Sequence, residues 1–216
     1  MRFPSLTVAV VLLSLLFGSF LYLDRAPPTF NKQQFQSIIN TISQQHTTTP
    51  LTLNQTITLL QHHLHTLHPT HIHIHDEWLF NLAGGFKTGL LLLHASLTEY
   101  VAIWGSAVDT VGHSGRNWAT FDDWIVSGNG TWWAEGALNV THHVPFEYLH
   151  TERFAGRVVQ LQANTWMLEY CHGVIPALLP FGLADGLVSS LDPLLVWKSV
   201  RQYGWMTLHS LLQGKV

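Results

Sequence analysis

The stretch Leu90-Leu-Leu-Leu-His-Ala-Ser-Leu97 and the stretch Tyr100-Val-Ala-Ile-Trp-Gly-Ser-Ala-Val108 decide the fold of this chain. Both are apolar runs of the length of buried β-strands, and a short polar break separates them. Similar runs continue as far as Tyr170, and Gly-rich breaks between them supply turn chemistry. The further runs are Asp122 to Ser127, Thr131 to Trp133 and Val158 to Tyr170. We therefore expect a mainly β body, as a closed or sandwich-like sheet whose interior has room for a hydrophobic ligand.

The composition limits the class of protein. The 216 residues suit one globular domain with appendages. Hydrophobic residues make up 47% of the chain and charged residues only 11%, which is an apolar balance for a globular protein. Ten scattered Lys and Arg residues and a net charge of -3 exclude a nucleic-acid-binding surface. The single cysteine, Cys171, excludes an internal disulfide and a multi-cysteine zinc site.

The N-terminal stretch is apolar. Phe3 to Leu23 contains no charged residue and is long enough to cross a bilayer as a helix. A cleaved signal peptide is the alternative, but it has a shorter apolar region and a small-x-small cleavage site. Leu21-Tyr-Leu-Asp-Arg25 follows instead, so we expect an uncleaved transmembrane anchor over residues 1–25. Sequons at Asn54, Asn129 and Asn139 favour a lumenal body.

Residues 26–75 predict a linker and two helices. Phe35, Ile38, Ile39 and Ile42 recur at helical spacing. Thr52 with Gln55 forms a capping-box pattern ahead of a second apolar stripe, which ends near Pro69. Both helices are expected to pack on the body or on the membrane surface.

Seven histidines lie between His62 and His75. His71, His73 and His75 alternate, so on a strand they would share one face, as metal ligands can. No carboxylate or cysteine in the tract completes a ligand set. A polar, pH-sensitive surface is therefore favoured, and we expect neither a metal nor another cofactor.

The last part of the chain, residues 173–216, changes character. Gly173 to Ser190 is apolar, and Asp192-Pro193 is a helix start with a capping residue followed by proline. Asp185 and Lys198 interrupt the apolar pattern. We expect two helices lying along a membrane surface, with a buried pair of core helices as the alternative. Residues 76–172 between the helical parts form the predicted ligand-binding domain.

Two acids stand out in the β region. Asp123 lies in Trp118-Ala-Thr-Phe-Asp-Asp-Trp124, and Glu169 lies in Asn164-Thr-Trp-Met-Leu-Glu-Tyr170. A carboxylate among aromatic and aliphatic side chains must be paired, hydrogen-bonded or protonated. Two carboxyls brought together in an apolar pocket share a proton, which suits proton transfer or the binding of a cation. On spacing alone, two solvated acids with no site fit the sequence equally well.

Several longer motifs occur along the chain: Glu77-Trp-Leu-Phe-Asn-Leu-Ala-Gly-Gly85, Leu92-Leu-His-Ala-Ser-Leu-Thr-Glu-Tyr100, Gly112-His-Ser-Gly-Arg116, Asn164-Thr-Trp-Met-Leu-Glu-Tyr170 and Gly173-Val-Ile-Pro176. Together they resemble one family, that of fungal-type sterol C-8 isomerases and the sigma non-opioid receptor. The resemblance runs from the N-terminal anchor to the C-terminus. Pro180-Phe-Gly-Leu-Ala-Asp185 and the ending Leu211-Leu-Gln-Gly-Lys-Val216 look closer to the isomerase branch.

This resemblance implies a fold and a location. The expected architecture is a cupin-like β-barrel with an N-terminal membrane helix and two C-terminal helices against the membrane beneath the barrel. The implied assembly is a homotrimer in the endoplasmic reticulum membrane, crossing it once and in contact with membrane lipid.

The resemblance also implies a site. Asp123 and Glu169 match the two acidic site residues, and Tyr100 matches a tyrosine that hydrogen-bonds near them. Trp104 stands where an aromatic pocket wall is expected, and we expect Trp118 and Trp166 to contact substrate as well. Between Asn139 and Leu161 the match is loose, so the strands there are not fixed by it.

The implied reaction moves a sterol ring double bond from the delta-8 to the delta-7 position. One carboxylic acid adds a proton, and the other carboxylate stabilises a carbocation-like intermediate and accepts the departing proton. Lipophilic amines should then act as inhibitors, because a fixed positive nitrogen imitates the cation. The alternative is a receptor without enzymatic activity that binds lipophilic amines or sterols in the same pocket. The sequence does not decide which carboxyl starts protonated.

Overall fold

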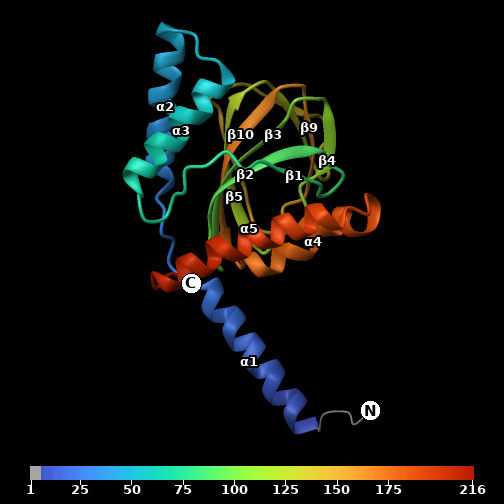
Figure 1. Cartoon of the computed structure of the whole chain (residues 1–216). Helices are drawn as coiled ribbons and strands as arrows, with labels where there is room; N and C mark the ends of the chain where they lie inside the picture. The colour runs from blue at the N-terminus through green and yellow to red at the C-terminus, as the bar shows by residue number, and fades with distance from the viewer. Residues whose placement is uncertain (1–5) are drawn as a thin grey trace.

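Residues 6–216 are described by a computed structural model, in which two antiparallel β-sheets form the body (Figure 1). The larger sheet has the strand order β1-β2-β3-β10-β5-β8, and the smaller one has the order β4-β9-β6-β7. The strands are β1 Leu79–Asn81, β2 Thr88–Ala95, β3 Glu99–Ser106, β4 Thr110–His113, β5 Ala119–Ser127, β6 Gly130–Ala134, β7 Thr141–His143, β8 Tyr148–Thr151, β9 Arg157–Leu161 and β10 Thr165–Gly173. The prediction of a mainly β body with flanking helices is confirmed.

The prediction of a closed barrel is wrong. Among the described residues the strands make two separate sheets rather than one continuous ring. The chain turns after Ser106, and β4 pairs with β9 of the smaller sheet, while β3 pairs with β2 and β10 of the larger one. The sheets face each other through side chains instead of shared hydrogen bonds. Their buried contact consists of Phe86, Ile125, Trp132, Leu149, Val159, Leu161 and Met167.

Two predicted strand runs differ in detail from the structure. Val158 to Tyr170 is two strands in different sheets, because Asn164 adopts a left-handed φ of 64° and turns the chain between β9 and β10. The segment His71 to His75 is not a strand. It lies along β2 as irregular chain, with the His73 N–H donating to the Leu93 carbonyl at 2.9 Å. The strand on which the three histidines would share a face is therefore absent.

The helices α2 (Lys32–Thr48) and α3 (Leu53–Leu67) cover the outer face of the larger sheet (Figure 1). The predicted capping box is present, since the Thr52 hydroxyl accepts from the Gln55 N–H and the Gln55 side chain accepts from the Thr52 N–H. These helices were predicted to pack either on the body or on the membrane surface, and they pack on the body. Their apolar stripes join Leu91, Val101, Ile103, Trp124, Leu168 and Tyr170 in one buried cluster.

Helix α1 (Leu6–Asp24) extends away from the body (Figure 1). The predicted membrane span begins at Phe3, which lies outside the described residues. Within residues 6–216, no helix combines the length and the apolar character that a membrane crossing requires. The structure therefore lends no support to the predicted transmembrane anchor.

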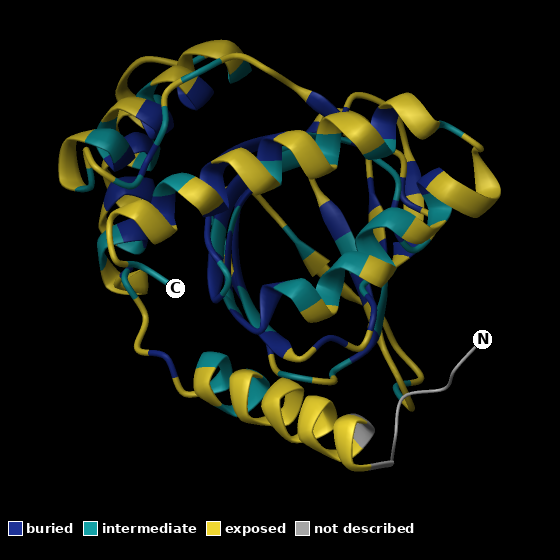
Figure 2. Cartoon of the chain, turned by 60° about the horizontal axis from the view of Figure 1, so that its bottom comes forward, coloured by how far each residue is buried: buried dark blue, intermediate teal, exposed yellow. Residues whose placement is uncertain are grey.

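The C-terminal part lies across one end of the two sheets (Figure 2). A 3-10 turn (Ile175–Leu178), α4 (Leu179–Ala184) and a π-helical turn η2 (Asp185–Ser189) precede α5 (Pro193–Leu212). The Asp192 side chain caps α5 by accepting from the Leu195 N–H at 2.9 Å. One face of α5 is buried and includes Leu195 and Met206, whereas most of its remaining surface is exposed. The buried face of α5 shows that this helix packs on the body, and the placement of both helices along a membrane stays a prediction.

Candidate functional site

The two predicted acids lie directly opposite each other on neighbouring strands. Strand β10 is central in the larger sheet, and its Glu169 is the cross-strand partner of Asp123 on β5. Side chains of a strand alternate between its two faces, so both carboxyls face the interior between the sheets. Tyr100 on β3 joins them from the other side of β10, and its hydroxyl donates to Glu169 Oε1 at 2.6 Å.

The surroundings favour a shared proton on this carboxyl pair. Burial raises the pKa of Asp123 well above its usual value, and the negative charge and hydrogen bonding of Glu169 raise it further. Burial also raises the pKa of Glu169, but hydrogen bonds from Tyr100 and Asp123 oppose this effect. The carboxylic acid form is thus favoured more strongly on Asp123, and Glu169 is the better place for the single negative charge.

A cavity of about 240 Å³ contains the carboxyl pair. Its walls are mainly aliphatic and aromatic side chains from both sheets, with Tyr100 and Trp104 beside the acids. Residues of the C-terminal helices, Leu178, Phe181, Val200 and Tyr203, line it as well. An apolar cavity with a few converging polar groups is typical of a small-molecule site.

Only two of the four aromatic residues that were predicted to contact substrate lie at the cavity. Tyr100 and Trp104 line the cavity, whereas Trp118 and Trp166 are not among its lining residues. Trp118 is 39% exposed, and its indole N–H donates to Asp24 at the end of α1 at 2.9 Å. Trp166 packs against Trp78 and the outer cluster. Trp166 is three residues before Glu169 on β10, so alternation places it on the opposite face of the sheet.

A polar section of the cavity wall was not singled out from the sequence. It consists of Asn81, Ser114, Asn117, Thr151 and Arg157. Ser114 belongs to the Gly-His-Ser-Gly-Arg motif, which was noticed only as part of the resemblance. The Arg157 side chain is held by donation from Nη2 to the His150 carbonyl at 2.9 Å. These groups give the cavity a second polar region apart from the carboxyl pair.

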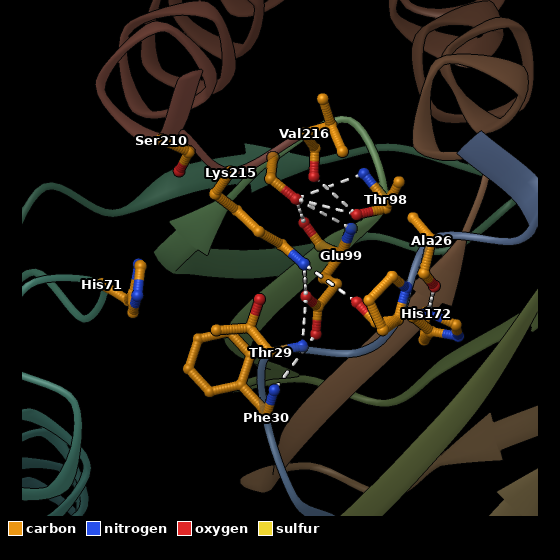
Figure 3. Close-up of polar contacts among 12 residues, drawn as sticks. Ala26, Thr29, Phe30, His71, Thr98, Glu99, His172, Ser210, Lys215 and Val216 are labelled. Atoms are coloured by element: carbon orange, nitrogen blue, oxygen red, sulfur yellow. Dashed lines mark hydrogen bonds and ion pairs between the residues drawn. The ribbon is translucent and has the colours of Figure 1, made fainter. Parts of the chain in front are cut away.

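A second buried carboxylate, Glu99, precedes Tyr100 on β3 and therefore lies on the opposite face of the larger sheet. Figure 3 shows Glu99 among its polar partners. Its side chain is fully buried and pairs with Lys215 Nζ at 2.5 Å. It also accepts from the Thr29 N–H at 2.7 Å and from the Tyr170 hydroxyl at 2.6 Å. Burial alone would raise the pKa of Glu99, but these partners together lower it below its usual value. Glu99 thus fastens the linker before α2 and the segment after α5 to the sheet.

The histidine tract surrounds this anchor. Phe30 of the linker packs edge-on against His68 and His94, with ring centroids 4.9 Å apart in both cases. His94 is 1% exposed, and its Nδ1 lies 3.0 Å from the His71 carbonyl. Within the described part of the chain, no group of three or more metal-ligating side chains comes together. Within the tract, His68 and His71 pack against Phe30 of the linker, and the reading as a polar, pH-sensitive surface stays a prediction.

These histidines make stability depend on pH. Burial lowers the pKa of His94 to about 4, and burial also lowers the pKa of His68 and His71. Glu99 nearby acts against this effect, and Lys215 reinforces it for His71 and His94. In the unfolded chain a histidine gains its proton near pH 6.5, whereas folded His94 stays neutral until about pH 4. Folding stability is therefore lost as pH falls through this window.

We expect His94→Gln to reduce this pH dependence. The wild-type free energy of unfolding should fall by about 2 kcal/mol between pH 6.5 and 5 through this histidine. The raised pKa of Asp123 acts in the opposite direction, so the wild-type slope alone is not decisive. Denaturant unfolding at several pH values should give a flatter slope for His94→Gln than for wild type. His142→Gln, at an exposed position, is the control. Equal slopes for wild type and His94→Gln would contradict the assignment.

Fold and cavity together define a β-sheet protein with a buried acidic pair inside a hydrophobic ligand cavity. Comparison with known families gives the relationship. Residues 6–215 match the model of the family described as "ERG2 and Sigma1 receptor like protein". The chain belongs to this family, as its motifs predict.

Curated relatives come from both branches. The chain is 45% identical over 128 residues to the sigma non-opioid intracellular receptor 1 of Xenopus tropicalis, covering 59% of this chain and 58% of the relative. It is 43% identical over 139 residues to the Gallus gallus receptor of the same name, covering 63% and 62%. It is 36% identical over 150 residues to the C-8 sterol isomerase ERG2 of Gibberella zeae, covering 68% and 63%. The matched region thus spans about three fifths of each relative's length.

Solved structures show a weaker likeness. KdgF from a Halomonas species has a TM-score of 0.39 at 9% identity, covering 45% of this chain and 86% of that one. An RmlC-like cupin from Shewanella frigidimarina has a TM-score of 0.38 at 9% identity, covering 45% and 83%. Similarity at this level is too low to assign a function.

Proposed function

We propose that this protein is a sterol delta-8 to delta-7 isomerase that acts through the Asp123–Glu169 pair. The observation that carries the proposal is the pair itself: two opposed carboxyls in an apolar cavity, Asp123 buried and Glu169 half-buried, with surroundings that favour one shared proton. Such a pair can add a proton to one carbon and remove a proton from another without any cofactor.

The asymmetry of the pair suggests the order of events. Asp123 carries the proton and delivers it to one carbon of the ring double bond, so a C–H bond forms and a cation develops on the other alkene carbon. Glu169, held by the Tyr100 hydroxyl, faces that cation as a carboxylate. It then takes a proton from a neighbouring carbon, and the electrons of that C–H bond form the new double bond. One proton enters and one leaves, so the product is an isomer.

The rest of the cavity supports this chemistry. Aromatic rings at Tyr100, Trp104 and Phe121 line the wall near a developing positive charge and can stabilise it. Apolar walls keep water from trapping the cation. The burial of Tyr100 raises the pKa of its hydroxyl well above the usual value, so it remains a donor to Glu169 throughout.

Complementation tests the isomerase proposal. The chain should restore delta-7 sterols in a cell that lacks its own C-8 sterol isomerase, measured by mass spectrometry of extracted sterols. A protein that reaches the membrane fraction in normal amount but produces no delta-7 sterol would contradict the proposal.

The second candidate function is a receptor without enzymatic activity. The relatives named as sigma receptors match at 43% and 45% identity, against 36% for the relative named as an isomerase. In this reading Glu169 binds the ammonium group of a lipophilic amine and no bond is made or broken. The complementation experiment separates the two functions.

Both functions predict amine binding through Glu169. A lipophilic tertiary amine should bind wild type, and Glu169→Gln should weaken binding by at least about tenfold, because the buried ammonium group loses its charged partner. Displacement of a radiolabelled amine measures this. Glu152→Gln, an exposed acid outside the cavity, is the matched control. Equal affinity of Glu169→Gln and wild type would remove the charge-pairing argument.

We also propose where the protein works. The exposed side of α5 carries Leu194, Trp197, Trp205 and Leu208, which suits contact with membrane lipid beside the cavity. A sterol would then pass from the bilayer to the cavity past the C-terminal helices. The asparagines of all three sequons are exposed, which supports a body in the lumen of the endoplasmic reticulum. The homotrimer remains part of this proposal, on the family resemblance.

A further inference from the structure

Trp104 is more than an aromatic wall. It lies on β3 opposite Met167 of β10, and alternation puts it on the same face as Tyr100 and Glu169. Its ring lines the cavity and packs edge-on against Phe86, with centroids 5.8 Å apart. The orientation of the indole therefore has consequences for the carboxyl pair.

The indole nitrogen of Trp104 is buried without a hydrogen-bond partner in the described part of the chain. Asp123 Oδ1, in the same cavity, is also buried and unpaired there. A buried donor without an acceptor destabilises a fold, so such a group calls for an explanation. An indole N–H can only donate, and the negatively charged groups among the cavity's lining residues are the two carboxyls.

The effect of Trp104 on the carboxyls agrees with this view. Burial is the largest influence on both groups and raises the pKa of each, whereas the Trp104 N–H acts to lower both. Trp104 and the two acids share one face of the larger sheet and one cavity, although the indole nitrogen has no partner within hydrogen-bond geometry.

We propose that the Trp104 indole N–H is a positioning group that donates to the ionised carboxyl pair when a cation occupies the cavity. This inference rests on the proposed function, since it needs the pair to bind positive charge. It adds a second donor to the one supplied by Tyr100. Without Trp104, the pair holds its proton to higher pH, and cation binding at lower pH is lost.

A pair of matched variants tests the proposal. Trp104→Phe keeps an aromatic wall but removes the N–H. Trp166→Phe is the control, because its indole nitrogen is also buried and unpartnered, but on the outer face of the sheet. Binding of N,N-dimethyldodecylamine to the detergent-solubilised full chain is measured between pH 4.5 and 8, where this amine stays protonated. Thermal unfolding confirms that each variant is folded.

The expected result is a shift of the acid limb. The midpoint below which amine binding is lost should move up by about one pH unit in Trp104→Phe and stay in place in Trp166→Phe. If Trp104→Phe folds poorly, Trp104→Met, which also lacks a donor and fills the space flexibly, is measured in its place.

The other outcomes overturn the inference in distinguishable ways. One such outcome is that Trp104→Phe leaves the midpoint unchanged and lowers the affinity equally at every pH. That result would show that Trp104 contributes only apolar contact. An equal shift in Trp166→Phe would show that the effect does not come from the cavity. Absence of pH-dependent amine binding in wild type would remove the proposed charge pairing itself, and this inference with it.

Discussion

Asp123→Asn and Glu169→Gln should each lower sterol turnover by at least about 100-fold, the usual contribution of a general acid or base. In the proposed mechanism, Asp123→Asn removes the proton that starts the reaction. Glu169→Gln removes the charge that would face the cation and the base that would end the reaction. The measurement is the ratio of delta-7 to delta-8 sterol in membranes that contain equal amounts of each variant.

The fold should survive both changes. The negative charge of Glu169 raises the pKa of Asp123, whereas a hydrogen bond from Asp123 lowers the pKa of Glu169. An amide in place of either carboxyl leaves no repulsion between two negative charges. Melting temperatures at or above the wild-type value would separate a loss of chemistry from a loss of structure. Glu152→Gln is again the control for the removal of an acid elsewhere. Near-normal product from either site variant would contradict the assignment of roles.

Glu99→Gln should destabilise the fold by about 3 kcal/mol, as expected for breaking a buried ion pair from one side. The change leaves the Lys215 ammonium group, whose side chain is only 14% exposed, without its charged partner. It also weakens the acceptor for the Thr29 N–H and the Tyr170 hydroxyl. Denaturant unfolding at pH 7 measures the effect.

A double-mutant cycle tests whether the ion pair is responsible. Glu99→Gln/Lys215→Met should be less destabilised than the sum of the two single variants, because no unpaired charge is left buried. The comparison variant is Glu77→Gln, which breaks the exposed pair with Arg201 and should change stability by less than about 1 kcal/mol. Additive single effects, or a Glu99→Gln variant as stable as wild type, would show that the pair is not the anchor.

Local patterns predicted much of the fold. The apolar runs marked the strands, and the Thr52–Gln55 box marked the start of α3. The alternation of side chains along a strand also predicts which tryptophans face the carboxyl pair. Residues an even number apart on a strand share a face, and residues an odd number apart do not. Trp166 is three residues from Glu169 and faces outward, whereas Trp104 is four residues from Tyr100 and faces the carboxyl pair. Trp118 precedes β5 and is outside this pattern.

Other features depend on contacts between distant segments. Glu99 stands in the polar break between two strands, where an exposed acid is the ordinary expectation. Its burial depends on Thr29, Tyr170 and Lys215, which come from three separate parts of the chain. Strand pairing is non-local too, because β4 is followed in sequence by β5 but pairs with β9. The division of Val158 to Tyr170 depended on one left-handed residue, Asn164.

Strand β10 lies between β3 and β5 in the larger sheet, and a break in the backbone between β5 and β10 places the two acids on different fragments. Leu138, in the turn between β6 and β7, is 99% exposed, so a break in the backbone there disturbs little packing. The fragment before the break supplies β3, β5 and Asp123. The fragment after it supplies β10 and Glu169, which must insert between those two strands. The proposed amine site is complete only when the two fragments have joined, so amine binding would report that the halves of this protein have met.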